Sequence, residues 1–80
     1  MHLKILAFGI AREIFGGSLT ILEIPENATV SGLKTQLEAT YPRLQKLASY
    51  LVAVNDEYAQ PTQTLFPTDE IAIIPPVSGG

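Results

Sequence analysis

Hydrophobic and polar residues alternate in two short segments near the N-terminus, which is the pattern of a β-strand that buries one face. The first segment covers residues 2–8, and its expected inner face carries Leu3, Ile5 and Ala7. The second covers residues 18–24 and stops at Pro25, because proline has no backbone N–H to donate to a neighbouring strand. The two segments predict a hairpin, and residues 9–17 between them are predicted to form a loop with a short turn around residues 11–15.

An amphipathic helix is predicted after this hairpin. Thr29 has the side chain of a helix N-cap, because its hydroxyl oxygen can accept a hydrogen bond from a backbone N–H of the first turn. Apolar residues then recur at helical spacing on one face: Val30, Leu33, Leu37 and Tyr41. Pro42 follows, and the residue before a proline is biased away from helical backbone, so the helix is expected to end near Tyr41.

The rest of the chain predicts three further strands, one of them short. Residues 51–55 form a compact apolar strand, followed by a polar turn at residues 55–57 and a short extended piece around Tyr58. An irregular crossing then leads to the last strand, residues 70–74, which the two prolines at positions 75 and 76 terminate.

This order of elements predicts an α+β domain with two layers, in which one helix covers one face of a mixed sheet of about five strands. The first and last strands are expected to lie side by side in the centre of the sheet. The domain is expected to cover residues 1–74. Residues 75–80 would form an extended tail that leaves from a central, well-anchored strand.

Composition narrows the class of protein. The chain has 80 residues, 46% of them hydrophobic, which is enough for one domain with a modest core. It has no cysteine, which excludes disulfides and thiol nucleophiles and favours the reducing cytoplasm. An apolar run long enough to cross a membrane is missing, so we expect a soluble protein without a membrane partner. The net charge is −3 and there is no basic stripe, so nucleic acid is not expected as a partner.

The residues that usually form catalytic or metal sites are sparse. His2 is the only histidine and is expected on the surface. Two adjacent acidic pairs, Asp56-Glu57 and Asp69-Glu70, are interpreted as solvated turn residues rather than as an acid/base pair. A metal site needs three or four ligands. We therefore expect neither a metal nor a permanently bound cofactor.

The C-terminal carboxylate is the candidate for chemistry. Gly79 and Gly80 have no Cβ, so a carboxylate carried on them can enter a narrow enzyme channel. The carboxylate is ionised at neutral pH and is a poor electrophile. A partner that uses ATP must first convert it to an acyl-adenylate, which a sulfur or nitrogen nucleophile can then attack. The six residues from Pro75 span about 20 Å when extended, which suits delivery into a partner.

Four segments of the chain resemble one family of small sulfur carriers. They are residues 4–8, residues 11–13 (Ala-Arg-Glu), residues 54–55 (Val-Asn) and residues 69–80. Together they resemble the small subunit of molybdopterin synthase, the MoaD family, which shares the ubiquitin-like β-grasp fold with the thiamine carrier ThiS. The ending Pro-Pro-Val-Ser-Gly-Gly is the most specific part. Thr68 is a departure, because the family commonly has glycine there, and it bears on the local turn geometry.

The resemblance implies a cycle in which the chain is a co-substrate and is not catalytic alone. An E1-like enzyme would use ATP to adenylate the carboxylate of Gly80, and a persulfide sulfurtransferase would convert it to a thiocarboxylate. The large synthase subunit, in a complex of two small and two large subunits, would receive the tail: Pro75, Pro76, Val77, Ser78, Gly79 and Gly80. There the thiocarboxylate would donate sulfur to cyclic pyranopterin monophosphate. Two such donations form the dithiolene that later binds molybdenum or tungsten.

A docking face for these partners is predicted from strand alternation. If the odd-numbered residues of the first strand pack under the helix, Phe8 and Ile74 belong to the opposite, open face, with Tyr58 close to them. These three residues are predicted to form an apolar patch at the root of the tail, with partial burial under loop residues as the alternative. Arg12 is predicted to pair with a partner carboxylate or, equally, with an acidic residue of its own chain.

Three other functions stay open at this point. The chain could serve another sulfur pathway, such as thiamine synthesis. It could be a ubiquitin-like modifier, because the same acyl-adenylate can form an amide with a lysine side chain. It could also be a binding module with an inert tail, in which case deletion of Gly79 and Gly80 would change nothing.

Overall fold

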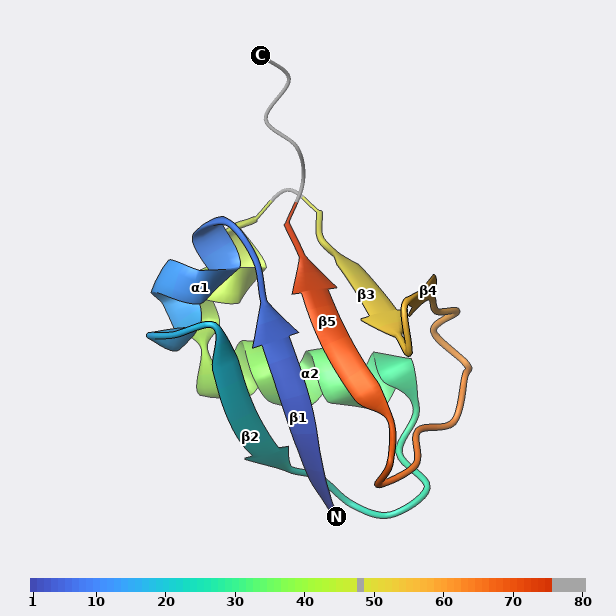
Figure 1. The fold of residues 1–80 in the computed structure, drawn as a ribbon. Coiled ribbons are helices and arrows are strands. Elements are labelled where there is room, and N and C mark those ends of the chain that lie inside the picture. The colour runs from blue at the N-terminus through green and yellow to red at the C-terminus, as the bar shows by residue number, and fades with distance from the viewer. Residues whose placement is uncertain (48, 76–80) are drawn as a thin grey trace.

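The computed structural model describes residues 1–47 and 49–75, so the predictions for Pro76, Val77, Ser78, Gly79 and Gly80 lie outside the described residues. The described part forms five strands, two α-helices and one 3₁₀ helix (Figure 1). In chain order these are β1 (His2–Ala7), α1 (Ile10–Phe15), β2 (Leu19–Glu23), α2 (Val30–Thr40), the 3₁₀ helix η1 (Pro42–Lys46), β3 (Leu51–Val54), β4 (Glu57–Tyr58) and β5 (Glu70–Ile74).

The strands form one mixed sheet in the order β2-β1-β5-β3-β4. β1 and β5 are parallel neighbours at the centre, as predicted, and the other neighbouring pairs are antiparallel. α2 crosses behind the strands and covers one face of the sheet, here called the covered face (Figure 1). The described elements leave the opposite face uncovered, and we call it the open face. This is the two-layer α+β arrangement that the order of elements predicts.

The hydrophobic core lies between α2 and the covered face. Thr29 caps the helix, because its Oγ1 accepts a hydrogen bond from the backbone N–H of Gly32 at 3.2 Å. The residues predicted to face each other across this interface are buried: Leu3, Ile5, Ala7, Val30, Leu33 and Leu37. Tyr41 directly follows the last helical residue, and its ring packs against that of Phe15 with the centroids 4.7 Å apart. The predicted strand face and helix end are confirmed.

Residues 10–15 form a helix where the sequence predicted a loop with a short turn. Ala11 of this helix is fully buried, and the backbone N–H groups of Gly16 and Gly17 both donate to the carbonyl of Arg12 at 2.9 Å. Gly16 has a φ of 79°, a left-handed conformation that glycine adopts without a steric penalty. Six residues are too few to show a helical period, so packing and capping stabilise α1 rather than any pattern visible in the sequence.

η1 was also not predicted. It follows α2 with only Tyr41 between them and begins at Pro42, a residue that tolerates the first turn of a helix because its missing N–H would have no partner there. η1 buries Leu44 in the core, which holds the connection between α2 and β3 against the domain.

The turns around the later strands are more ordered than predicted. Asn55 and Asp56 connect β3 to β4 with φ angles of 52° and 70°, as in a type I′ turn. Asp69 is not simply a solvated turn residue. Its carboxylate accepts hydrogen bonds from the side-chain amide of Asn55 at 2.9 Å and from the backbone N–H of Phe66 at 2.8 Å. Thr68 is not among the described residues with a positive φ, so this turn does not require the glycine common in the family.

Candidate docking face and tail root

An apolar row crosses the open face through all five strands. The strand registers place neighbouring side chains beside one another, and from β2 to β4 the row is Leu19, Leu6, Ala72, Ala53 and Tyr58. Side chains that are paired in this way contact each other on the same face of a sheet. The two ends of the row remain open to solvent, with Leu19 52% and Tyr58 71% exposed. A continuous apolar surface of this kind on a small domain is typical of a protein-binding site.

A second apolar group lies next to this row, toward the end of β5. Ile74 is the last residue of β5, and Phe8 directly follows β1. Members of both groups and two acidic residues line one groove of about 300 Å³: Leu6, Phe8, Ala53, Asp56, Tyr58, Glu70, Ala72 and Ile74. The structure thus brings Phe8, Tyr58 and Ile74 into one groove. Ile74 is half-buried, whereas Phe8 and Tyr58 are exposed rather than covered by loop residues.

Charged residues occupy the opposite half of the open face. Lys4 of β1 lies in register with Glu70 of β5, and both are exposed. Beyond them, Nε2 of His2 lies 3.1 Å from a carboxylate oxygen of Glu23, and both side chains are exposed, which agrees with the predicted surface position of the histidine. The exposed Ile21 of β2 lies in register with Lys4, so this half of the open face is mixed, whereas the half at the root of the tail is apolar.

The tail root itself packs against Gly9. Pro75 is the last described residue, and a Cβ added to Gly9 would lie 3.1 Å from the Cγ of Pro75. Gly9 has φ 54° and ψ −133°, a backbone conformation that residues with a Cβ rarely adopt. Glycine therefore meets two requirements at this position: the turn from β1 into α1 and the close approach of Pro75.

Arg12 lies outside the groove that contains the other predicted docking residues. It is exposed on α1 and lines a separate shallow hollow together with Gly9, Glu13 and Gly17. Within residues 1–47 and 49–75 it forms no ion pair, so the alternative of an internal salt bridge finds no partner there. Through Gly9, this hollow adjoins the tail root.

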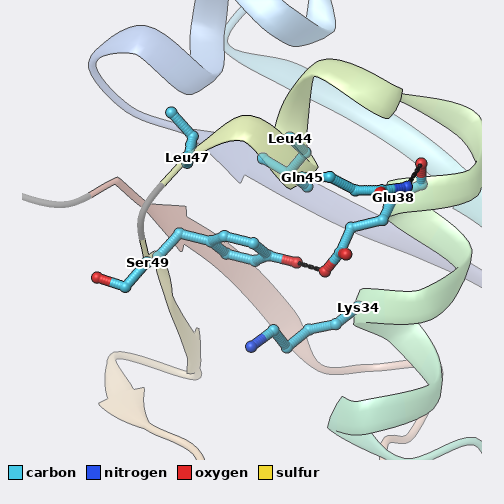
Figure 2. Close-up of a pocket in the computed structure, with 7 residues that line it drawn as sticks. Lys34, Glu38, Leu44, Gln45, Leu47 and Ser49 are labelled. Atoms are coloured by element: carbon cyan, nitrogen blue, oxygen red, sulfur yellow. Dashed lines mark hydrogen bonds between the residues drawn. The ribbon is translucent and has the colours of Figure 1, made fainter.

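A cluster on the helix side of the sheet was not found by sequence reasoning. The hydroxyl of Tyr50 donates a hydrogen bond of 2.6 Å to Glu38, and the Nζ atom of Lys34 lies 4.8 Å from the centre of the tyrosine ring. These residues line a hollow on the surface. Figure 2 shows Lys34 and Glu38 projecting into it from α2, with Ser49 on its other side. Burial raises the pKa of Tyr50 above its ordinary value, and the Glu38 carboxylate raises it further. Because each member already has a partner in the cluster, we interpret it as a structural link between α2 and the start of β3.

Among the described residues, no group of three or more His, Cys, Asp or Glu side chains is placed to hold a metal ion. In the same part of the chain, no helix is both long enough and apolar enough to cross a membrane.

The sheet order, the single crossing helix and the chain leaving from a central strand define a ubiquitin-like β-grasp protein. The structure is similar to that of SAMP1 from Haloferax volcanii, with a TM-score of 0.84 and 25% identity over 100% of both chains. It is also similar to the ubiquitin of Caldiarchaeum subterraneum, with a TM-score of 0.66 and 26% identity over 100% of this chain and 98% of that one. The predicted fold class is confirmed.

Sequence comparison identifies the family. The ThiS family model matches residues 5–80. The chain is 36% identical to the molybdopterin synthase sulfur carrier subunit of Arabidopsis thaliana, over 100% of this chain and 84% of that protein. It is 40% identical to the subunit of the same name in Dictyostelium discoideum, over 96% of this chain and 94% of that protein. The chain belongs to the ThiS family, and the predicted resemblance to molybdopterin synthase sulfur carriers is confirmed.

Proposed function

We propose that this chain is the sulfur carrier subunit of a molybdopterin synthase, acting in the cytoplasm in molybdenum cofactor biosynthesis. The observation that carries the proposal is its similarity to molybdopterin synthase sulfur carrier subunits along the whole chain, at 36% identity for the A. thaliana protein. The chain is a sulfur-donating co-substrate. The catalytic groups belong to its partners, and it holds no cofactor of its own.

The proposed chemistry takes place at the carboxylate of Gly80. An E1-like enzyme joins this carboxylate to the AMP portion of ATP and releases pyrophosphate. The terminal sulfur of a donor persulfide then attacks the acyl carbon, and AMP leaves. A thiol cleaves the resulting S–S bond and leaves a thiocarboxylate at Gly80. This sulfur is transferred to cyclic pyranopterin monophosphate, and two transfers form the dithiolene of molybdopterin.

The large synthase subunit is the proposed receiver of the tail, in a complex of two small and two large subunits. Residues 75–80 reach about 20 Å when extended, enough to place Gly80 inside a partner while the domain stays outside. The groove containing Phe8, Tyr58 and Ile74 lies where the chain leaves the domain, which supports its proposed role as the docking face. Arg12 is proposed to meet a partner carboxylate beside the tail root.

Intact mass spectrometry tests the proposed function. The chain is incubated with an E1-like adenylating enzyme, ATP and a persulfide source, with a known sulfur carrier as the control for enzyme competence. We expect a mass gain equal to the exchange of one oxygen for sulfur. Deletion of Gly80 is expected to abolish this gain while the thermal unfolding midpoint stays nearly unchanged. An unchanged mass of the native chain, with the known carrier converted, would contradict the proposal and favour a binding module.

Two other functions, a protein modifier and a thiamine-pathway carrier, would begin with the same adenylation of Gly80 and differ in what happens afterwards. Similarity to SAMP1, a small archaeal modifier, favours a protein modifier, in which a lysine amine attacks the acyl-adenylate and the chain becomes attached through an amide. In cell extract, such a function predicts covalent adducts that contain the whole mass of this chain. The carrier function instead predicts that the thiocarboxylate form, added to the large subunit and cyclic pyranopterin monophosphate, yields molybdopterin. A thiamine-pathway carrier would fail in that assay.

A further inference from the structure

Two carboxylates, Asp56 and Glu70, line the apolar groove on the open face. Both are exposed, and neither forms an ion pair within the part of the chain that the structure describes. They reach the groove from different elements, since Asp56 belongs to the turn between β3 and β4 and Glu70 begins β5. The groove therefore combines an apolar floor with negative charge.

Two hydrogen bonds between Asn55 and Glu70 fix the relative position of the backbone segments that carry these two carboxylates. The backbone N–H of Glu70 donates to Oδ1 of Asn55 at 3.0 Å, and the backbone N–H of Asn55 donates to the carbonyl of Glu70 at 2.8 Å. Asp56 follows Asn55 in the type I′ turn. The fold thus fixes the backbone positions of Asp56 and Glu70 relative to each other.

The carboxylates and the tail root lie at opposite ends of β5. Glu70 is its first residue and Ile74 its last, which separates them by about 13 Å along the strand. The chain leaves through Pro75, directly after the apolar end. A protein that binds the C-terminal segment therefore meets the apolar end of the groove first and reaches the carboxylates farther along it.

We propose that the protein receiving the tail places an apolar side chain in this groove and lysine or arginine side chains against Asp56 and Glu70. The inference rests on the proposed function, in which that protein is the large subunit of molybdopterin synthase. Opposite charges at the rim of an interface accelerate the encounter and fix the orientation of the partners. Asp56 and Glu70 thereby determine specificity and align the domain so that its tail points into the partner.

A second copy of the chain is a poor occupant of this groove. Each copy carries a net charge of −3. Lys4 is the one lysine or arginine within the described strands, and it lies beside Glu70 on the same face. Two open faces brought together would therefore oppose like charges, which disfavours association. A receiving protein with basic residues at the contact has no such conflict.

The kinetics of association test this inference. The double variant Asp56→Asn and Glu70→Gln removes both charges and keeps the shapes of the side chains. Its binding to the large subunit is measured by stopped-flow or surface-immobilised kinetics at about 0.02 M and about 0.5 M salt, where screening differs strongly. We expect the association rate constant to fall about three- to tenfold at low salt and much less at high salt, with little change in dissociation.

The matched control is Glu26→Gln with Glu38→Gln, which makes the same change in net charge at two residues that line neither the groove nor the hollow beside Arg12, and the amide oxygen of a glutamine at position 38 can still accept the hydrogen bond from Tyr50. An equal loss in the control would overturn the inference, because overall charge would then explain the effect. Unchanged rates in Asp56→Asn/Glu70→Gln, or self-association of the native chain through the groove, would overturn it as well. Failure of the native chain to bind the large subunit at all would instead contradict the proposed function.

Discussion

The two faces of the sheet use alternate residues of the same strands in opposite ways. On the covered face, Leu3 and Ile5 of β1 are fully buried under α2, so their apolar surface is removed from water within the domain. On the open face, Leu6 of the same strand is only half-buried, and its neighbour Leu19 on β2 is 52% exposed. Both faces are apolar near the end of β5, but the side chains of the open face are only partly buried by folding.

This difference in burial means that the covered face contributes mainly to folding stability, and the open face is available for binding. Burial of an apolar side chain stabilises the folded domain roughly in proportion to the area that leaves the water. The apolar row of the open face contributes less to folding, because much of it stays in contact with solvent. Its surface becomes buried when a partner covers it, which is what the proposed docking of the tail-receiving protein provides. Substitutions on the two faces should therefore affect different measurements.

Leu33→Ala, in the part of α2 that packs on the covered face, should have the largest effect on folding. Leu33 is fully buried between α2 and the sheet, and its truncation leaves a cavity, so we expect a loss of about 2–5 kcal/mol in the free energy of unfolding. Leu19→Ala removes the same side chain from the open face and should cost less than about 1 kcal/mol. Urea denaturation of both variants measures the difference. Equal losses would mean that the open face is part of the folding core.

Phe8→Ala on the open face should instead affect binding. Phe8 lines the groove and is 49% exposed, so we expect affinity for the large subunit to fall about tenfold, with a change in folding stability below about 1 kcal/mol. The same effect is expected for Ile74→Ala. Phe66→Ala is the matched control, because Phe66 is similarly exposed, at 57%, but lies outside the groove. Titration calorimetry compares the three. Native affinity in both groove variants would remove the proposed docking face.

The alternation of apolar and polar residues predicts which side chains belong to each face, because it follows from the geometry of a strand. Successive side chains point to opposite sides, so the burial of Leu3 and Ile5 and the exposure of Phe8 follow from one rule. The same reasoning places the first and last strands together and identifies the groove residues Tyr58 and Ile74. These parts of the fold and of the candidate site depend on regular patterns, and regular patterns are visible in a sequence.

Features that depend on one contact between distant residues could not be predicted. The bond from Tyr50 to Glu38 joins residues 12 positions apart that belong to no common pattern. The helix α1 depends on the burial of Ala11 and the left-handed Gly16, and six residues show no period. Asp69 organises its turn through Asn55, which lies on another loop. In each case the determining partner is known only when the chain is folded.

Gly9→Ala should destabilise the domain at the point where the open face meets the tail. The new Cβ would lie 3.1 Å from Pro75 on a backbone with a φ of 54°, so we expect a loss of about 1–2 kcal/mol in the free energy of unfolding. Gly17→Ala is the control, since Gly17 does not have a positive φ and a Cβ there would meet no described atom within 4 Å. Guanidinium denaturation of both variants measures the difference, and equal stabilities would show that Gly9 can relax.

Tyr50→Phe should have the smallest effect at neutral pH and a distinct one in alkali. Loss of the hydrogen bond to Glu38 should cost about 1 kcal/mol at pH 7. The pKa of Tyr50 is raised in the folded state by burial and by Glu38, so the unfolded chain loses this proton first as the pH rises. Its contribution to stability is therefore complete below about pH 10, the ordinary pKa of tyrosine, and is lost above it.

The difference in unfolding free energy between the native chain and Tyr50→Phe should consequently shrink, and then reverse, as the pH increases above about 10. Lys34 lies against the same ring, but it is present in both proteins, so its direct contribution largely cancels in the difference. Tyr58→Phe serves as the control, because Tyr58 is 71% exposed and loss of its hydroxyl should leave the free energy of unfolding nearly unchanged. Urea denaturation from pH 7 to about pH 11 measures all three proteins. A constant difference for Tyr50→Phe across this range would show that the tyrosine ionises in the folded domain as readily as in the unfolded chain, and that its burial under α2 is incomplete.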